Sequence, residues 1–156
     1  MTPLELQDEL VEEMKELFKD YLYRSASSKE RVPLQVFPQH IPINETDDEE
    51  DPVPYLIVRL SSGDDDGTRD SNNIVKLVII AGIYDDNLNA QGHRDVMNII
   101  QKIYDRFHKN PNLHDKAAYT GEFHWAAQED NYYPFYFGAC SIAFNIAAIR
   151  REDEYA

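Results

Sequence analysis

The stretch YDDNLNAQGHRD contains residues whose spacing suggests a metal-binding loop. Asp85, Asn87 and Asn89 alternate in the way that the first oxygen ligands of an EF-hand calcium loop do. With Asp85 at the first position, such a loop needs a glycine at the sixth and a glutamate at the twelfth, but Ala90 and Val96 stand there. The sequence therefore predicts no calcium site, and we interpret the stretch as a polar connection between a strand and a helix.

Other residue types that could do chemistry give no stronger signal. The only cysteine, Cys140, lies in a strand-like run on an apolar face, where we expect it to be buried and unreactive. Glu122 and His124 could form a metal or acid–base pair, but an exposed polar strand face explains them equally well. The five histidines show no H-x-x-x-H spacing, and phosphate-loop, dinucleotide and nucleophile-elbow motifs are missing from the sequence. No enzyme class, metal or cofactor is predicted.

The charge balance disfavours several kinds of partner. Fifteen Lys and Arg stand against 29 Asp and Glu, which gives a formal charge of −14. Nucleic-acid binding depends on basic side chains that neutralise phosphates, so we expect no sequence-specific nucleic-acid partner and no anionic membrane surface. Apolar runs fall short of the roughly 18 residues that cross a bilayer, and the acidic N-terminus is unlike a signal peptide. We therefore expect a cytoplasmic protein.

The 156 residues, 42% of them hydrophobic, predict a single domain that spans residues 1–156 and has its own core. Thr2 and Glu5 form a capping box for a helix whose apolar residues continue at helical spacing to Leu22. This apolar stripe is interpreted as core, although it could also bind a partner. A second helix is predicted near 90–109, capped by Asn89 or a neighbour, and KNPN stops it after Lys109.

The remaining apolar runs predict a mainly antiparallel sheet of about four to five strands, and hence an α+β fold. Prolines permit only a short or edge strand around Leu34 to Phe37. Both alternating faces of the run Leu77 to Ile83 are apolar or small, so this strand should lie centrally and be covered on both sides. Either the two helices divide the faces between them, or a neighbouring subunit covers one.

Three segments are predicted to be acidic and polar: a mobile loop at 44–54, a long hairpin loop at 61–73 and a C-terminal tail at 150–156. The carboxylates of the two loops are candidates for contact with a partner. They are Asp47, Asp48, Glu49, Glu50, Asp51, Asp64, Asp65 and Asp66.

The succession PVPYLIVRL, IVKLVIIAGIYDDN, GHRDVMNIIQKIYDRF and YYPFYFGACSIAFNI resembles the small tail-completion or tail-terminator proteins of tailed bacteriophages and prophages. The resemblance covers most of residues 33–149. It includes the Pro-rich approach to the first long strand, the acidic loop and the strand that ends in Tyr-Asp. It also includes the Gly-x-Arg-Asp start of the second helix and the aromatic-Pro turn before the last strand.

The resemblance implies structural work and brings no cofactor. Such proteins are α+β subunits that form a ring of about six copies on the finished tail tube, halt its growth and offer a surface to the head. The implied partners are the chain itself, tail-tube protein and head–tail connector proteins, first in the bacterial cytoplasm and then in the virion tail. Two alternatives stay open: a monomeric host-interaction or adaptor domain with acidic docking loops, and an uncharacterised enzyme.

Overall fold

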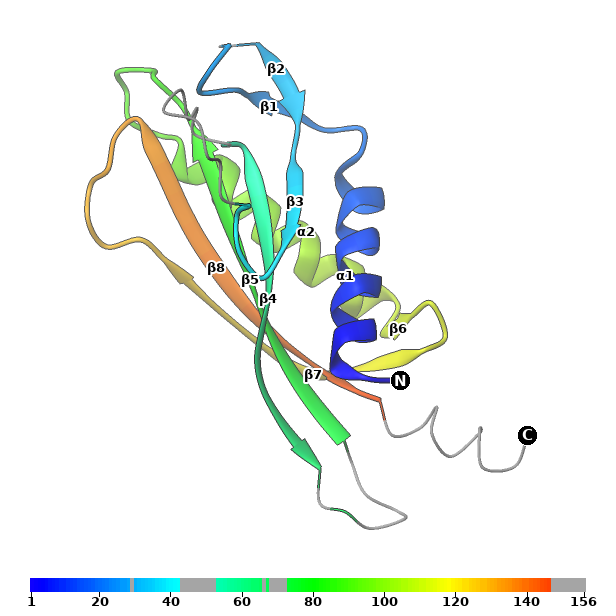
Figure 1. Cartoon of the computed structure of the whole chain (residues 1–156). Helices are drawn as coiled ribbons and strands as arrows, with labels where there is room; N and C mark the ends of the chain where they lie inside the picture. Colours follow the sequence, from blue (N-terminus) through cyan, green and yellow to red (C-terminus); the bar gives the residue numbers. More distant parts are fainter. Residues whose placement is uncertain (29, 43–52, 66, 68–72, 147–156) are drawn as a thin grey trace.

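The computed structural model describes residues 1–28, 30–42, 53–65, 67 and 73–146 (Figure 1). Most of the predicted loop 44–54 and the whole tail 150–156 lie outside the described residues. The elements are, in order, α1 (Pro3–Phe18), β1 (Leu22–Arg24), β2 (Arg31–Pro33), β3 (Gln35–Pro38), β4 (Tyr55–Asp65), β5 (Asn73–Tyr84), α2 (His93–Lys109), β6 (Asn112–Leu113), β7 (Ala117–Ala127) and β8 (Phe135–Asn145).

The strands form one six-stranded sheet, in the order β3-β4-β5-β8-β7-β6, and a separate two-stranded sheet of β1 and β2. All neighbours in the large sheet are antiparallel except β3 and β4. The predicted α+β class is confirmed, and β5 is central and β3 lies at an edge, as expected. The number of strands is larger than predicted because β1, β2 and β6 are only two or three residues long, too short to show an alternating pattern.

The helix boundaries differ from the prediction at two points. The Thr2 hydroxyl accepts the Glu5 N–H at 3.1 Å, as expected, but α1 ends at Phe18. Leu22 belongs to β1, because pairing with β2 outweighs the helical spacing of the apolar residues. The N-cap of α2 is Gly92, with no side-chain cap, and Asn89 lies outside the helix. Neither helix is long and apolar enough to cross a membrane, as far as the described residues go.

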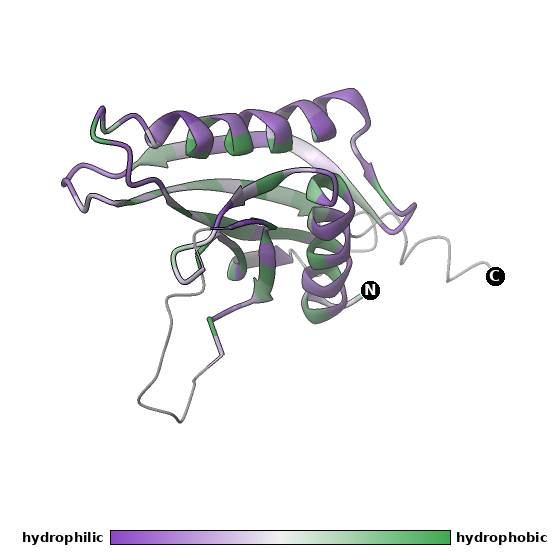
Figure 2. Ribbon diagram, turned by 90° about the horizontal axis from the view of Figure 1, so that it is seen from above, coloured by the Kyte–Doolittle hydropathy of each residue, from purple (hydrophilic) through white to green (hydrophobic). Residues whose placement is uncertain are grey.

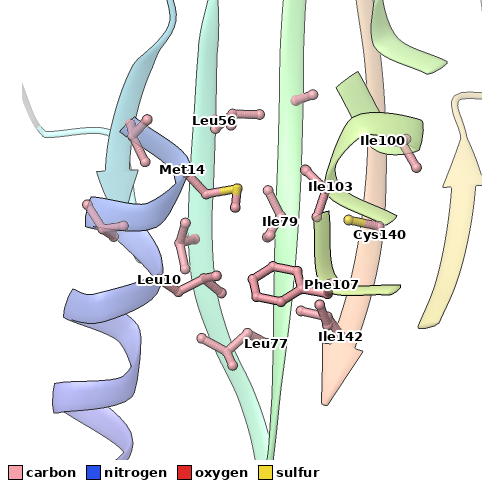
Figure 3. Close-up of a cluster of buried hydrophobic side chains, with 14 of the residues drawn as sticks. Leu10, Met14, Leu56, Leu77, Ile79, Ile100, Ile103, Phe107, Cys140 and Ile142 are labelled. Atoms are coloured by element: carbon pink, nitrogen blue, oxygen red, sulfur yellow. The ribbon is translucent and has the colours of Figure 1, made fainter. Parts of the chain in front are cut away.

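Both helices pack on the same face of the large sheet. Figure 2 shows α2 lying along the sheet with its hydrophobic residues on the side of the strands. In Figure 3, side chains of α1 and α2 converge on β4, β5 and β8. The labelled members of this core are Leu10, Met14, Leu56, Leu77, Ile79, Ile100, Ile103, Phe107, Cys140 and Ile142. The two helices therefore do not divide the faces of β5, which was the first of the two expected arrangements.

Two glycines let α2 approach the sheet closely. A Cβ on Gly138 of β8 would lie 2.5 Å from Cγ1 of Val96, and a Cβ on Gly92 would lie 2.3 Å from the ring of Tyr136. These distances are far below van der Waals contact, so any larger residue would push the start of the helix away from β8. The glycines thus fix the first turn of α2 against the strand.

The connection between β4 and β5 is shorter than the predicted hairpin loop 61–73. Ser62 to Asp65 pair with Lys76 to Asn73, so both strands continue into this segment. The polar sequence of its β4 half gave no strand signal because that half is exposed, whereas Val75 in the β5 half is part of the core. Ser61 to Asp65 are exposed, and polar residues are stable there on both faces.

Cys140 is buried, as predicted, with 1% of its surface exposed, and burial raises the pKa of its thiol to about 12. We expect a thiol reagent to label the native protein only at the rate of global unfolding, because the thiolate is the reacting species. The measurement is labelling rate against urea concentration. Cys140→Ser should lower the free energy of unfolding by about 1–3 kcal/mol, since it buries a hydroxyl. Rapid labelling without urea would contradict the placement of β8.

Candidate functional site

The face of the sheet opposite the helices is only partly covered by the described residues. Every second residue of β5 and β8 points to this side, and most of these residues are half-buried, although Gly82 and Ala143 are buried. A small cluster around Val53, Tyr55 and Ile57 covers the end near β3. Ile80 and Phe137 pack against this cluster. We call the remainder the open face, and it comprises Ile74, Lys76, Val78, Ala139 and Ser141. Its apolar character without a second layer makes it a candidate contact surface.

The pair Glu122 and His124 lies at the border of the open face on β7. The Glu122 carboxylate is 2.8 Å from Nζ of Lys76 and 3.4 Å from Nε2 of His124. The hydrogen bond from Lys76 holds the pKa of Glu122 below its usual value, so the carboxylate stays ionised. His124 is 71% exposed. The pair therefore forms, together with Lys76, a surface chain of ion pairs across the sheet.

Among the described residues, the sheet has two open edges. On the β7 side, β6 pairs only with Ala117 and Ala118, and the Tyr119 N–H donates to the Pro111 carbonyl. Beyond Tyr119 no described strand pairs with the outer edge of β7, where Trp125 is 59% exposed. The Gln128 N–H donates to Phe137 O on β8. Because hydrogen-bonded pairs alternate along an antiparallel ladder, the peptide groups of odd-numbered positions such as Ala127 face outward.

On the other side, β3 covers β4 only from Tyr55 to Val58, and the Gln39 side chain accepts the Leu60 N–H at 2.9 Å. Beyond Leu60 no strand of the described part of the chain follows along β4. The segment Ser61–Asp64 is thus a second exposed edge, at the opposite side of the sheet from β7. Exposed edges are templates for pairing with another chain unless charge or shape protects them.

The predicted partner-contact carboxylates are described only in part. Asp64 and Asp65 lie exposed in the last two positions of β4, paired with Ile74 and Asn73 of β5. The Asp65 side chain accepts the Gly67 N–H at 3.0 Å. The others lie outside the described residues: Asp47, Asp48, Glu49, Glu50, Asp51 and Asp66. The structure therefore places Asp64 and Asp65 on the open β4 edge and does not test the rest.

A polar cleft of about 510 Å³ separates the β1–β2 hairpin from the end of β5 and the start of α2. Arg24 forms an ion pair with Asp86, and Arg31 lies opposite Arg24 in the hairpin. Loss of water and the nearby Asp85 raise the pKa of Asp95, which Arg31 partly offsets. Opposite charges compensate one another here, so we interpret the cleft as a polar contact between hairpin and sheet. Sequence reasoning missed it because β1 was assigned to the helix.

The stretch YDDNLNAQGHRD has a structural explanation for its alternating pattern. The Asp85 side chain accepts the Asn87 N–H at 3.0 Å, and Asn87 accepts the Asn89 N–H at 3.2 Å. Asn89 in turn accepts the Gln91 N–H at 3.3 Å. Each Asp or Asn thus bonds to the backbone two residues on, which is an Asx-turn. Three successive Asx-turns order the loop between β5 and α2.

A cluster of titratable groups joins α1 to α2 and the β6–β7 turn. Glu13 is 9% exposed and accepts from Arg106 Nε at 2.5 Å and from His114 Nε2 at 2.9 Å. Glu9 contacts the other nitrogen of His114 and accepts from Lys116 at 2.7 Å. The hydrogen bond to Glu9, followed by Glu13, raises the pKa of His114. Lys116, followed by His114, lowers the pKa of Glu9. The cluster holds the elements together as charged groups.

These shifts predict a defined pH dependence of stability. Because the pKa of His114 is raised in the folded protein, the protonated side chain stabilises the fold fully at pH values below the ordinary histidine pKa of 6.5. This contribution disappears as the pH rises through the pKa of His114 in the folded protein. The pKa of Glu9 is lowered, so the ionised carboxylate stabilises the fold at pH values above the ordinary pKa of 4.5. This contribution is lost as the pH falls through the pKa of Glu9 in the folded protein. In urea unfolding, the stability lost in His114→Gln should therefore be about 0.5 kcal/mol larger at pH 6 than at pH 9, a small value because water screens the cluster.

The control for this measurement is His124→Gln, because that side chain is 71% exposed and its pair with Glu122 is weaker. The control should change stability less than His114→Gln at either pH. A loss for His114→Gln that grows with pH would contradict the assignment.

Comparison with known proteins adds no family to this geometry. No protein-family model matches the chain, and no curated protein is similar to it in sequence. The candidate site therefore stands on the described residues alone: an open apolar sheet face bordered by two different open edges.

Proposed function

We propose that this protein is a structural subunit that joins copies of itself into a closed ring, and that the ring terminates a phage or prophage tail tube. The observation that carries the proposal is the one-sided cover of the sheet. Both helices pack on one face, while the open face and the outer edges of β4 and β7 have no second layer or strand among the described residues. Contact with other subunits would bury these surfaces.

The strand directions favour contacts that propagate around a ring. β4 is antiparallel to β5, β5 to β8 and β8 to β7, so β4 and β7 run in opposite directions. When a second copy lies beside the first in the same orientation, β7 of one and β4 of the next are therefore antiparallel. Such a contact joins two different surfaces, which makes it heterologous, and heterologous contacts close into a ring when the rotation allows.

The sequence resemblance and the charge support the role in a tail. A ring of about six copies is the assembly that this resemblance implies. With a formal charge of −14 for each chain, its surface would repel DNA phosphates, so a genome could pass without binding.

Charges at the open edges favour a second candidate, the monomeric adaptor. Asp64 lies at the β4 edge, and Glu122 lies on β7 beside Lys76. Charged residues on edge strands are a common protection against pairing with other chains. An adaptor of this kind would stay monomeric and would bind a basic partner through its acidic residues, which gives an outcome distinct from that of the ring.

Blocking the β7 edge tests the proposal. Ala127 is exposed and its peptide N–H faces the open edge, so Ala127→Pro should remove one donor and obstruct pairing while the β7–β8 ladder remains. The lost hydrogen bond and the carbonyl left without a partner should weaken the contact between subunits by about 1–3 kcal/mol, which corresponds to a roughly five- to hundredfold change in affinity. The measurement is electron microscopy of purified tail tubes that lack their terminator, mixed with wild type or variant and scored for capped ends.

Ala127→Thr is the matched control, because threonine keeps the N–H and favours strands. It should cap tubes as the wild type does, and both variants should unfold at a similar urea concentration. If wild-type protein neither caps tubes nor forms oligomers in light scattering, the ring is wrong and the adaptor takes its place. If Ala127→Pro caps normally, the part of the β7 edge around Ala127 is not in the contact.

A further inference from the structure

The free edges of β4 and β7 have the same length. β4 has a bulge after Leu60 and ends at Asp65, so its free segment is 61–65. β7 has an irregularity before Phe123 and ends at Ala127, so its regular free segment is 123–127. Bulges interrupt regular pairing, which sets the start of each segment. The two segments can therefore pair over their whole length when they lie antiparallel and end to end.

In this alignment the backbone groups of the two segments face each other. On β7 the odd-numbered positions face outward, and Trp125 is one of them. On β4 the Leu60 N–H faces outward, since it donates to the Gln39 side chain. The bulge inserts one residue after Leu60, so the alternation changes there and Gly63 faces outward. Trp125 of one copy and Gly63 of the next thus form a hydrogen-bonded pair.

The side chains of this pair also fit each other. Trp125 pairs with Cys140 and Gly63 pairs with Val75, so both lie on the side of the sheet that carries the helices. Trp125 is 59% exposed. Among the described residues, a Cβ on Gly63 would meet only the Ile74 carbonyl oxygen, at an ordinary contact distance of 3.5 Å. The glycine therefore leaves a space that its own chain does not use, and an aromatic ring on a neighbouring strand packs well over such a glycine.

The charges of the two edges favour the same alignment. It puts His124 opposite Asp64 and leaves Asp65 opposite an uncharged residue. Glu122 keeps its contact with Lys76 of its own chain, at 2.8 Å. A shift of two residues would instead put Glu122 opposite Asp64, and like charges in direct opposition destabilise a sheet. The end-to-end alignment thus opposes no two carboxylates among the described residues.

We propose that the contact between copies is one antiparallel ladder, in which residues 123–127 of one copy pair with residues 61–65 of the next and Trp125 packs over Gly63. The partner of each edge is thus a second copy of this chain, and the sheet continues from copy to copy. The inference rests on the proposed ring function and specifies the register of its contact.

Disulfide cross-linking between copies tests this register. Ser62 and Ala126 are exposed and lie opposite each other in the proposed ladder, as a non-hydrogen-bonded pair with Cα atoms about 4.5 Å apart. A disulfide spans this distance. Within one chain β5 and β8 separate the two positions, so a disulfide between them joins two copies. Cys140 is buried and should not compete.

The double variant Ser62→Cys with Ala126→Cys is oxidised at about 150 mM salt, which screens the repulsion between chains that each carry −14. Non-reducing electrophoresis gives the rate of joining, and mass spectrometry identifies the cysteines that are joined. Asp64→Cys with Ala126→Cys is the matched control, because these positions are diagonal neighbours about 7–8 Å apart, beyond the reach of a disulfide. The control should join at least about tenfold more slowly.

Two further substitutions, made in the Ser62→Cys, Ala126→Cys protein, test the contact of Trp125 with Gly63. Trp125→Ala removes the ring and Gly63→Val fills the space beneath it, so each should slow the joining roughly fivefold. Leu88→Ala is the matched control, because Leu88 is 90% exposed but lies in the loop after β5, away from both edges. All three positions are exposed and valine favours strands, so the variants should fold, and urea unfolding curves verify this.

The outcomes separate the register from the ring. Faster joining of the matched cysteines than of the control, slowed by Trp125→Ala and by Gly63→Val but not by Leu88→Ala, supports the register. Absent or equal joining, or a rate that Trp125→Ala or Gly63→Val leaves unchanged, overturns it, and the ring still stands if wild type caps tail tubes. Specific products that lengthen without closing into one discrete species keep the ladder and overturn the ring. If no variant joins and the wild type stays monomeric in light scattering without capping tubes, both are wrong.

Discussion

Packing of both helices on one face of the sheet is the constraint on which the rest of this structure depends. The core forms where α1 and α2 meet β4, β5 and β8, and its residues include Leu10, Phe107 and Ile79 (Figure 3). Gly138 and Gly92 allow α2 to lie close to β8, which no side chain at these positions would permit. The charged cluster of Glu13, Arg106 and His114 joins the two helices at the border of this core.

One-sided burial decides the character of the opposite surface. The residues of β5 that face away from the helices, such as Val78 and Ile80, are nearly as apolar as those that face them. A strand of this kind is usually covered on both sides. Here the small cluster around Tyr55 and Ile57 packs against Ile80, whereas Val78 stays half-buried among the described residues. The apolar excess on β5 is therefore the strongest physical reason to infer contact with other protein subunits.

The two edges of the sheet differ from each other in their exposed residues, and so do its two ends. The edge of β7 has exposed Trp125, and the edge of β4 has Asp64. At one end, Asx-turns hold Leu88 in solvent, and at the other the hairpin is polar and acidic. A subunit with unlike edges and unlike ends can form contacts that are heterologous around a ring and one-sided along its axis.

The sequence by itself determined the helices, the four long strands, the central place of β5 and the burial of Cys140. These features depend on local periodicity and capping, as the contact of Thr2 with Glu5 illustrates. Tertiary structure alone decided where Leu22 belongs, because strand pairing with Pro33 competes with helical spacing. It also decided the extent of the β4–β5 hairpin, because the exposed residues 61–65 of β4 have no burial pattern.

The same division holds for the candidate site. Hydrophobic alternation predicted that β5 needs cover on both faces, but periodicity does not say on which side a helix packs. That choice depends on contacts between residues far apart in sequence, such as Gly138 with Val96. In the sequence, the alternation of Asp85, Asn87 and Asn89 resembled the spacing of metal ligands. In the structure, their side chains accept hydrogen bonds from the backbone of their own loop. Residue types were readable from the sequence, but the direction of each side chain was fixed only by the packed backbone.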